Sequence, residues 1–236
     1  MKAVSIAVVL LTGLLPSTGQ GQQVRVSVQY VELPHADLTL LLADSPGNAA
    51  LHGKAMEMVR ANKARIVETC IGVCQSGEKA TVESVREEVF PTEITPPGIS
   101  YSIGNSPSNS VPPWLSETIY SPKHRSYTAF ETHNTATMLE MEVNVSEGER
   151  FVDLRLVPEF VSRLRLETMR EYKDERGDSS VRMPIYETWR ANTQLTLRSG
   201  QFSLVSVFAP KREQAAPFVE GRVLLFARAD LIDVED

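Results

Sequence analysis

The stretch that decides the fold is Thr137-Met138-Leu139-Glu140-Met141-Glu142-Val143-Asn144-Val145. Its odd positions from 139 onward are apolar, while the even positions from 140 onward are polar. Alternation with a period of two predicts a β-strand with one buried and one solvated face. Residues 146–149 carry a turn signal around Gly148, and residues 152–156 resume the alternation. We therefore expect an antiparallel hairpin here.

Similar strand signals lie on both sides of this hairpin. We expect further strands at 64–74, 79–90, 193–197, 202–208 and 222–228, with Gly77 and Gly200 in two of the connecting turns. No helical stretch separates these strands. That order predicts an antiparallel sheet and argues against β-α-β units with parallel strands.

The chain before residue 63 has a different pattern. Residues 24–30 alternate as a strand that Pro34 ends, residues 38–43 predict one or two helical turns introduced by Asp37, and residues 49–62 predict a helix. We therefore divide the chain into an N-terminal β-α-α unit, residues 20–62, and a mainly antiparallel β domain, residues 63–236. The fold class expected is α+β.

Two stretches of the β domain are expected to be irregular or polar. Residues 91–126 carry Pro91, Pro96, Pro97, Pro107, Pro112, Pro113 and Pro122, and each proline lacks the backbone donor that a sheet ladder needs. We expect a long loop or insertion there. Residues 163–182 are rich in charged side chains and predict the polar tip of a long hairpin.

The N-terminus is typical of a secretory signal peptide. Lys2 precedes an apolar run over residues 3–15, and Pro16 and small residues follow it. We expect a signal peptide over residues 1–19 with cleavage after Gly19, or alternatively after Gly21. A buried first helix is the competing interpretation.

Composition narrows the possible functions of the exported chain. The 236 residues include 24 basic and 30 acidic ones, a formal net charge of −6, which gives no basic footprint for nucleic acid. No run approaches the eighteen or so apolar residues of a membrane-spanning helix. We expect no nucleic-acid partner.

The two cysteines, Cys70 and Cys74, do not predict a disulfide if they share a strand. Their Cα atoms would then lie about 13 Å apart at ~3.3 Å per residue, whereas a bridge needs less than about 7 Å. A bridge would require a turn at Gly72. We expect two buried small apolar side chains, with a local bridge as the alternative.

The sequence contains no pattern that assigns catalysis. His35, His52, His124 and His133 are isolated, so we expect surface histidines, and there is no nucleophile elbow, P-loop or dinucleotide fingerprint. The carboxylates on strands are expected to be solvated. We therefore predict no catalytic residue, metal site, cofactor or small-molecule substrate, and the residues of any binding site stay unknown.

Three stretches, in order, resemble the secretin domain of bacterial type II and type III secretion and type IV pilus channels. Residues 63–84 are similar to its opening hairpin, with a polar-Gly turn. Residues 137–145 with 151–160 are similar to its paired strands, which end in a Pro-Glu, here Pro158-Glu159. Residues 183–204 are similar to its proline-led strand, its Asn-Thr pair and its Gly-Gln turn.

The resemblance implies a non-enzymatic envelope protein, exported to the periplasm or outer membrane of a Gram-negative-type envelope. It implies a subunit or accessory of a type II secretion or type IV pilus outer-membrane complex, with self-association or other secretion and pilus proteins as partners. The alternative is a soluble periplasmic or surface protein-binding module. An envelope enzyme such as a hydrolase is a third possibility.

Overall fold

The computed structural model describes residues 22–44, 47–95, 126–146, 148–171, 173–174, 177–178, 181–210 and 220–232. The expected signal peptide and most of the proline-rich stretch, residues 96–125, lie outside the described residues. Among the residues described, no helix combines the length and the apolar character that a membrane crossing needs.

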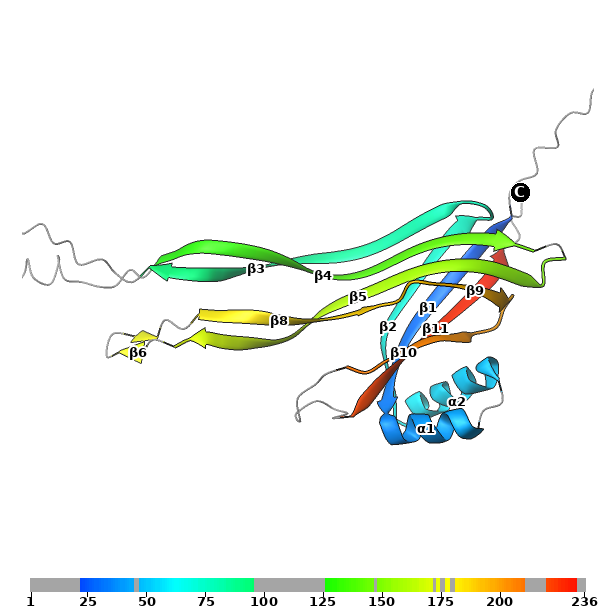
Figure 1. Ribbon diagram of the computed structural model, residues 1–236, viewed down its shortest axis with the longest axis horizontal. Helices are drawn as coiled ribbons and strands as arrows, with labels where there is room; N and C mark the ends of the chain where they lie inside the picture. The colour runs from blue at the N-terminus through cyan, green and yellow to red at the C-terminus, as the bar shows by residue number, and fades with distance from the viewer. Residues whose placement is uncertain are drawn as a thin grey trace, which may run out of the picture.

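Strands make up most of the described chain, with two short helices after the first strand (Figure 1). The elements in chain order are β1 (Gln23–Pro34), α1 (His35–Asp44), α2 (Asn48–Arg60), β2 (Arg65–Gln75), β3 (Lys79–Thr95), β4 (Ser126–Val145), β5 (Phe151–Arg170), β6 (Lys173–Asp174), β7 (Gly177–Asp178), β8 (Val181–Arg190), β9 (Thr193–Arg198), β10 (Ser203–Phe208) and β11 (Gly221–Ile232). The expected α+β class is confirmed.

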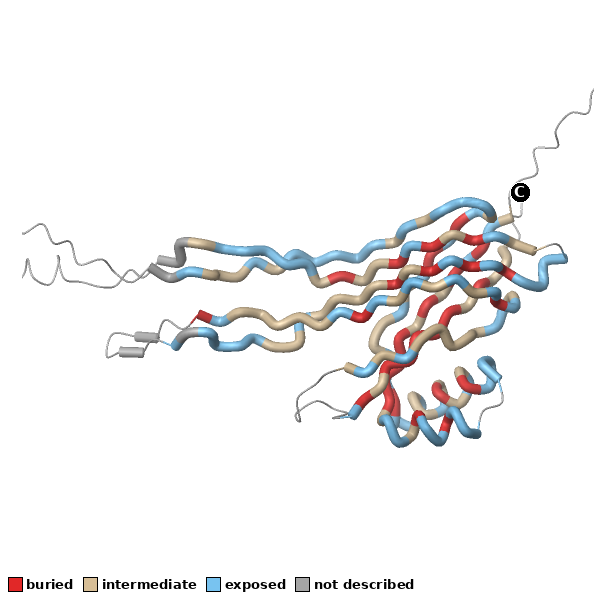
Figure 2. The backbone as a smooth tube through the Cα atoms, viewed as in Figure 1, coloured by how far each residue is buried: buried red, intermediate tan, exposed pale blue. Residues whose placement is uncertain are grey.

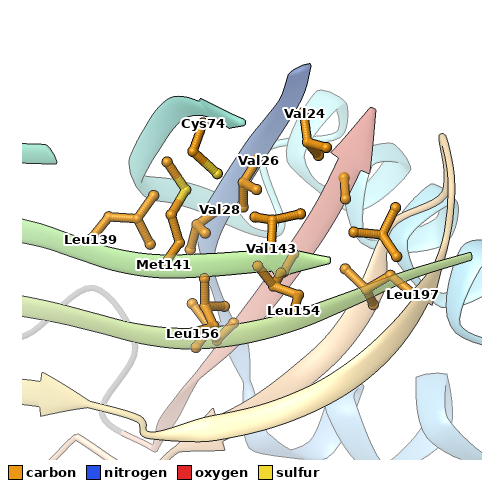
Figure 3. Packing of buried hydrophobic residues seen from close by; sticks show 14 of the residues in the cluster. Val24, Val26, Val28, Cys74, Leu139, Met141, Val143, Leu154, Leu156 and Leu197 are labelled. Carbon is orange, nitrogen blue, oxygen red and sulfur yellow. The ribbon is translucent and has the colours of Figure 1, made fainter. Parts of the chain in front are cut away.

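Apart from the short pair of β6 and β7, the described strands form two antiparallel sheets that pack face to face. Sheet A has the order β10-β11-β1-β2, and sheet B has the order β3-β4-β5-β8 with β9 also paired to β5. The core between them contains Val24, Val26 and Val28 from β1 against Leu139, Met141, Val143, Leu154, Leu156 and Leu197 from sheet B (Figure 3). Complete burial of such side chains contributes about 1.5–3 kcal/mol each, so this core is the main source of stability.

The two helices form a third layer on the other face of sheet A. Leu38 and Leu41 of α1 and Leu51 and Ala55 of α2 pack against Val31, Leu33, Leu224 and Phe226 of β1 and β11. Sheet A is therefore buried on both faces at one end of its strands. This explains why β11 has an almost continuous buried run, as expected of a strand covered on both sides.

The chain passes from sheet A to sheet B through a tight turn between β2 and β3. Gly77 adopts a φ of +88°, which favours glycine, and its N–H donates to the Val143 carbonyl at 2.7 Å. The Ser76 N–H donates to the Gln22 carbonyl at 2.9 Å, and the Ser76 hydroxyl accepts from the Val145 N–H at 3.0 Å. These bonds attach the turn to the start of β1 in sheet A and to the end of β4 in sheet B.

Two expectations about irregular stretches need correction. Strand β3 continues through Pro91 to Thr95, and β4 already begins at Ser126, so pairing persists at both borders of the proline-rich stretch. The ladder tolerates Pro91 because the register shifts between Pro91 and Glu93. The polar tip expected over 163–182 is likewise shorter in sequence, because β5 extends to Arg170 and β8 starts at Val181.

His52 was expected at the surface, but it is half-buried on the side of α2 that faces sheet A. Its ring stacks on Phe202, with 3.9 Å between centroids, and meets Phe226 edge-on at 5.1 Å. Its Nε2 lies 2.9 Å from Gln29 Oε1, to which it donates when it carries the proton. Burial, and then the positive charge of Arg228, lower the pKa of His52 below its usual 6.5.

We expect His52 to make stability depend on pH between neutrality and mild acid. Because its pKa is lower in the folded than in the unfolded chain, the unfolded chain binds the proton more readily. The free energy of unfolding should be full above pH 6.5 and fall as the pH decreases toward the folded-state pKa. Urea unfolding at a series of pH values measures this slope. His52→Phe, which keeps a stacked ring, should flatten it, whereas His35→Phe should not; equal slopes in all three proteins would contradict this assignment.

Candidate functional site

The pairing of β4 with β5 stops before either strand ends. It runs from Val145↔Val152 to Ala136↔Val161, and beyond that point β4 pairs only with β3, and β5 only with β8. Two separate hairpins therefore project from the sandwich, which we call the β3–β4 arm (84–95 and 126–135) and the β5–β8 arm (162–170 and 181–188). Figure 1 shows both arms extending to the left of the sandwich.

A groove of about 580 Å³ lies where the arms separate. Its walls are mostly hydroxyl and charged side chains, supplied by Ser84, Val85, Arg86, Glu88, Thr135, Ala136, Thr137, Phe160, Val161, Ser162 and Arg163. It is open to solvent and has positive and negative groups side by side. The arrangement suits hydrogen bonding to a polar chain and offers no enclosed reaction chamber.

An aromatic cluster lies beside the groove. Tyr30 of β1 contacts Phe160, Trp189 and Phe208, with ring centroids 5.7, 6.1 and 6.4 Å away. The Tyr30 hydroxyl is buried and has no hydrogen-bond partner among the described residues. Burial is the main cause of its raised pKa, so Tyr30 is a neutral core residue.

Four side chains connect the two arms across the fork, one from each arm strand. Glu88 Oε2 of β3 accepts hydrogen bonds from Arg163 Nη1 of β5 at 3.2 Å and from the Tyr186 hydroxyl of β8 at 3.3 Å. The His133 ring of β4 stacks on Tyr186, with 3.8 Å between centroids and 13° between planes. Burial and then the charge of Glu88 raise the pKa of Tyr186, so its hydroxyl stays a donor.

The arms also carry exposed apolar side chains. Val85, Val89, Phe130, Leu166 and Met169 are between 50% and 62% exposed. Figure 2 shows the contrast, with buried residues gathered in the sandwich and few in the arms. A two-stranded hairpin is marginally stable in water, and exposed strand edges with apolar side chains are typical of surfaces that pair with another chain.

The histidines and cysteines named in the sequence do not meet in one site. His52 on α2 and His133 on the β3–β4 arm belong to different parts of the fold. His35 is exposed on α1, and His124 lies outside the described residues. Cys70 and Cys74 are both free on β2, which runs through Gly72 without a turn, so the alternative of a local disulfide is wrong. Within the described ranges, no group of three or more His, Cys, Asp or Glu side chains could hold a metal ion.

One buried charged residue was not predicted from the sequence. Glu32 of β1 is fully buried, and its Oε2 lies 2.6 Å from both Nε and Nη2 of Arg65. The alternating pattern does not predict the burial of Glu32, because a strand sequence does not distinguish buried from solvated carboxylates. Arg65 lies opposite Glu32 in the register of β1 with β2.

No family model and no curated protein match this sequence. Solved structures that are similar to the chain are secretins. The secretin domain of InvG from the Salmonella SPI-1 injectisome has a TM-score of 0.43 at 10% identity, over 92% of this chain and 64% of that one. The Vibrio cholerae type IV competence pilus secretin PilQ has 0.41 at 9%, over 91% and 62%. The Escherichia coli K12 type II secretion system secretin GspD has 0.41 at 13%, over 91% and 51%.

The chain thus spans under two thirds of the length of these three proteins. Some similar secretins were solved together with other proteins. One InvG structure is of the basal body with PrgH and PrgK, and one Klebsiella pneumoniae structure is of an outer-membrane complex of PulD, PulS and the PulC HR domain.

Proposed function

We propose that this protein is a non-enzymatic, secretin-like envelope protein that self-associates through the two outer strands of sheet B. In this proposal it is an exported subunit or accessory of a type II secretion or type IV pilus outer-membrane complex. The observation that carries the proposal is the pair of projecting arms. The arms have exposed apolar side chains, and their strands β3 and β8 each pair with one neighbour only, so each has an edge that a partner strand could cover.

The strand directions of sheet B suit head-to-tail addition of copies. Within the chain, β3 is antiparallel to β4, β4 to β5, and β5 to both β8 and β9. If β3 of a second copy lies beside β8 and β9 of the first, in the same orientation, it is again antiparallel to them. Repetition of this contact is heterologous and can close a ring without any free sheet edge.

The exposed charges differ between the two edges of sheet B. On β3, Glu83 and Glu87 alternate with Lys79 and Arg86, whereas β8 and β9 present Arg182, Arg190 and Arg198, all exposed. Glu83 and Arg190 are at opposite ends of one row that crosses the sheet through Met138 and Glu159. Addition of a second copy at that row would place a carboxylate beside a guanidinium, which favours the head-to-tail order.

The native mass of the protein in mild detergent extracts of the envelope tests the proposal. We expect a large species that heating converts to single chains, because many edge contacts break together. A soluble protein with the mass of one or two chains would contradict assembly into a ring. That result would favour a soluble periplasmic or surface protein-binding module, for which the groove between the arms is the natural candidate surface.

A charge reversal tests whether the β3 edge is used. We expect Glu83→Arg to reduce the large species, because it puts like charges at the edge contact, and Glu83→Gln, which only removes the attraction, to reduce it less. Arg190 itself is left unchanged, because its Nε lies 3.4 Å from Glu159 Oε2 within the same chain. Glu140→Arg is the matched control, since Glu140 is exposed on the same sheet but lies on β4, away from either edge. Equal loss in Glu83→Arg and Glu140→Arg would count against this edge.

A further inference from the structure

We propose that Glu88, Arg163, Tyr186 and His133 form a latch that holds the two arms together, and that the arms separate when the latch is released. The inference concerns a single chain and does not rest on the proposed self-association. These four residues are called the latch below.

Side-chain contacts matter here because no backbone pairing of β4 with β5 joins the two arms. Past Ala136 and Val161, each arm is held by its own two-stranded ladder, and the groove lies between them. Even so, β3 lies against β8, the two outer strands of sheet B. Beyond the groove, Glu88 and Tyr186 make side-chain contacts that cross the fork.

The geometry makes Glu88 the centre of the latch. It is the acceptor for both strands of the opposite arm, from Arg163 on β5 and from Tyr186 on β8. Tyr186 is held twice, because its hydroxyl donates to β3 while its ring stacks on His133 of β4. Loss of the Glu88 carboxylate therefore removes the hydrogen bonds to both strands of the β5–β8 arm at once, and of the latch only the His133–Tyr186 stack remains.

The latch is weak enough to open while the sandwich stays folded. The Arg163 side chain is 46% exposed and that of Glu88 is 18% exposed, so solvent and salt screen their attraction. The side chains that surround the fork are mostly polar or half-exposed, in contrast to the buried core. Release thus exposes little additional apolar surface, and opening is local.

Distances between spin labels on the two arms test the latch. Labels are attached to Val89→Cys and Leu166→Cys, both on exposed positions, in the full chain with Cys70→Ala and Cys74→Ala. The latch variants are Glu88→Ala and the milder Tyr186→Phe, which keeps the stacked ring. Glu87→Ala is the matched control, because Glu87 is the exposed neighbour of Glu88 and forms no ion pair in the described part of the chain.

We expect Glu88→Ala to lengthen and broaden the distance distribution, Tyr186→Phe to do so less, and Glu87→Ala to leave it unchanged. Hydrogen exchange of arm amides should be about two- to fivefold faster in Glu88→Ala, with the sandwich amides unaffected. About 1 M salt, which shortens the Debye length to about 3 Å, should widen the unmutated distribution. Unchanged distances in the latch variants and in salt, or equal widening in Glu87→Ala, would overturn the proposal.

Discussion

Replacement of Gly72 by valine should lower the free energy of unfolding by about 3 kcal/mol, because overpacking of a dense core forces neighbours out of their rotamers. Gly72 lies on β2 in contact with sheet B. A Cβ at this position would overlap Cε of Met141 and lie 2.9 Å from Cγ2 of Val82. Both neighbours belong to sheet B. Val82 is partly buried, whereas Met141 is almost fully buried, so the end of the Met141 side chain has to move within a dense core.

Urea unfolding of the purified protein measures this cost. Gly53→Ala is the control, because nothing lies within 4 Å of a Cβ at Gly53 on α2, and removal of a helical glycine should stabilise by up to about 1 kcal/mol. Met141→Leu removes the overlapping Cε, so the double variant Gly72→Val with Met141→Leu should lose less than the sum of the single losses. Strict additivity would show that the crowding at Gly72 has another source.

Most of the strands could be predicted from sequence because they are half-buried; β11, which is covered on both sides, has instead a nearly continuous apolar run. Residues 137–145 alternate since one face of β4 packs into the sandwich and the other meets water. The helices were found for the same reason, from an apolar stripe that packs on sheet A. Local patterns of this kind indicate which side chains are buried. Here the buried side chains are those that face a neighbouring sheet or helix layer.

The arrangement of the strands could not be predicted in this way. β1 lies between β2 and β11, and its pairing of Gln23 with Ile232 joins the two ends of the described chain. No local pattern specifies a partner at that distance. Pro91 was expected to end β3, but a register shift lets the strand continue, which depends on β4 and not on the proline itself.

The candidate site is also a product of the topology. Its latch draws one side chain from each of four strands, and no spacing in the sequence brings Glu88 near Arg163 or Tyr186. The sequence resemblance indicated the paired strands of a secretin-like sheet. It did not indicate that the pairing of β4 with β5 stops at Ala136, which is what creates the fork.

Arg65→Ala should destabilise the protein by about 2–3 kcal/mol, toward the lower end of the cost of breaking a buried ion pair. Glu32 is fully buried, and the substitution takes away the guanidinium that lies 2.6 Å from its Oε2. The Arg65 side chain is 45% exposed, so water can enter the vacated space and reduce the loss. Arg65→Lys should recover only part of the stability, because an ammonium cannot supply two donors in one plane.

Arg25→Ala is the matched control for this comparison. Arg25 lies on the same sheet, is similarly exposed at 49%, and pairs with Asp230 at 3.3 Å. Asp230 retains some contact with solvent and also keeps Arg228 at 2.6 Å as a second partner. Its loss should cost less than about 1 kcal/mol, as for a surface ion pair. Glu32→Leu with Arg65→Leu, which removes both charges, should be more stable than Arg65→Ala alone. Equal losses for Arg65→Ala and Arg25→Ala in urea unfolding would mean that burial of Glu32 adds nothing to the strength of its pair.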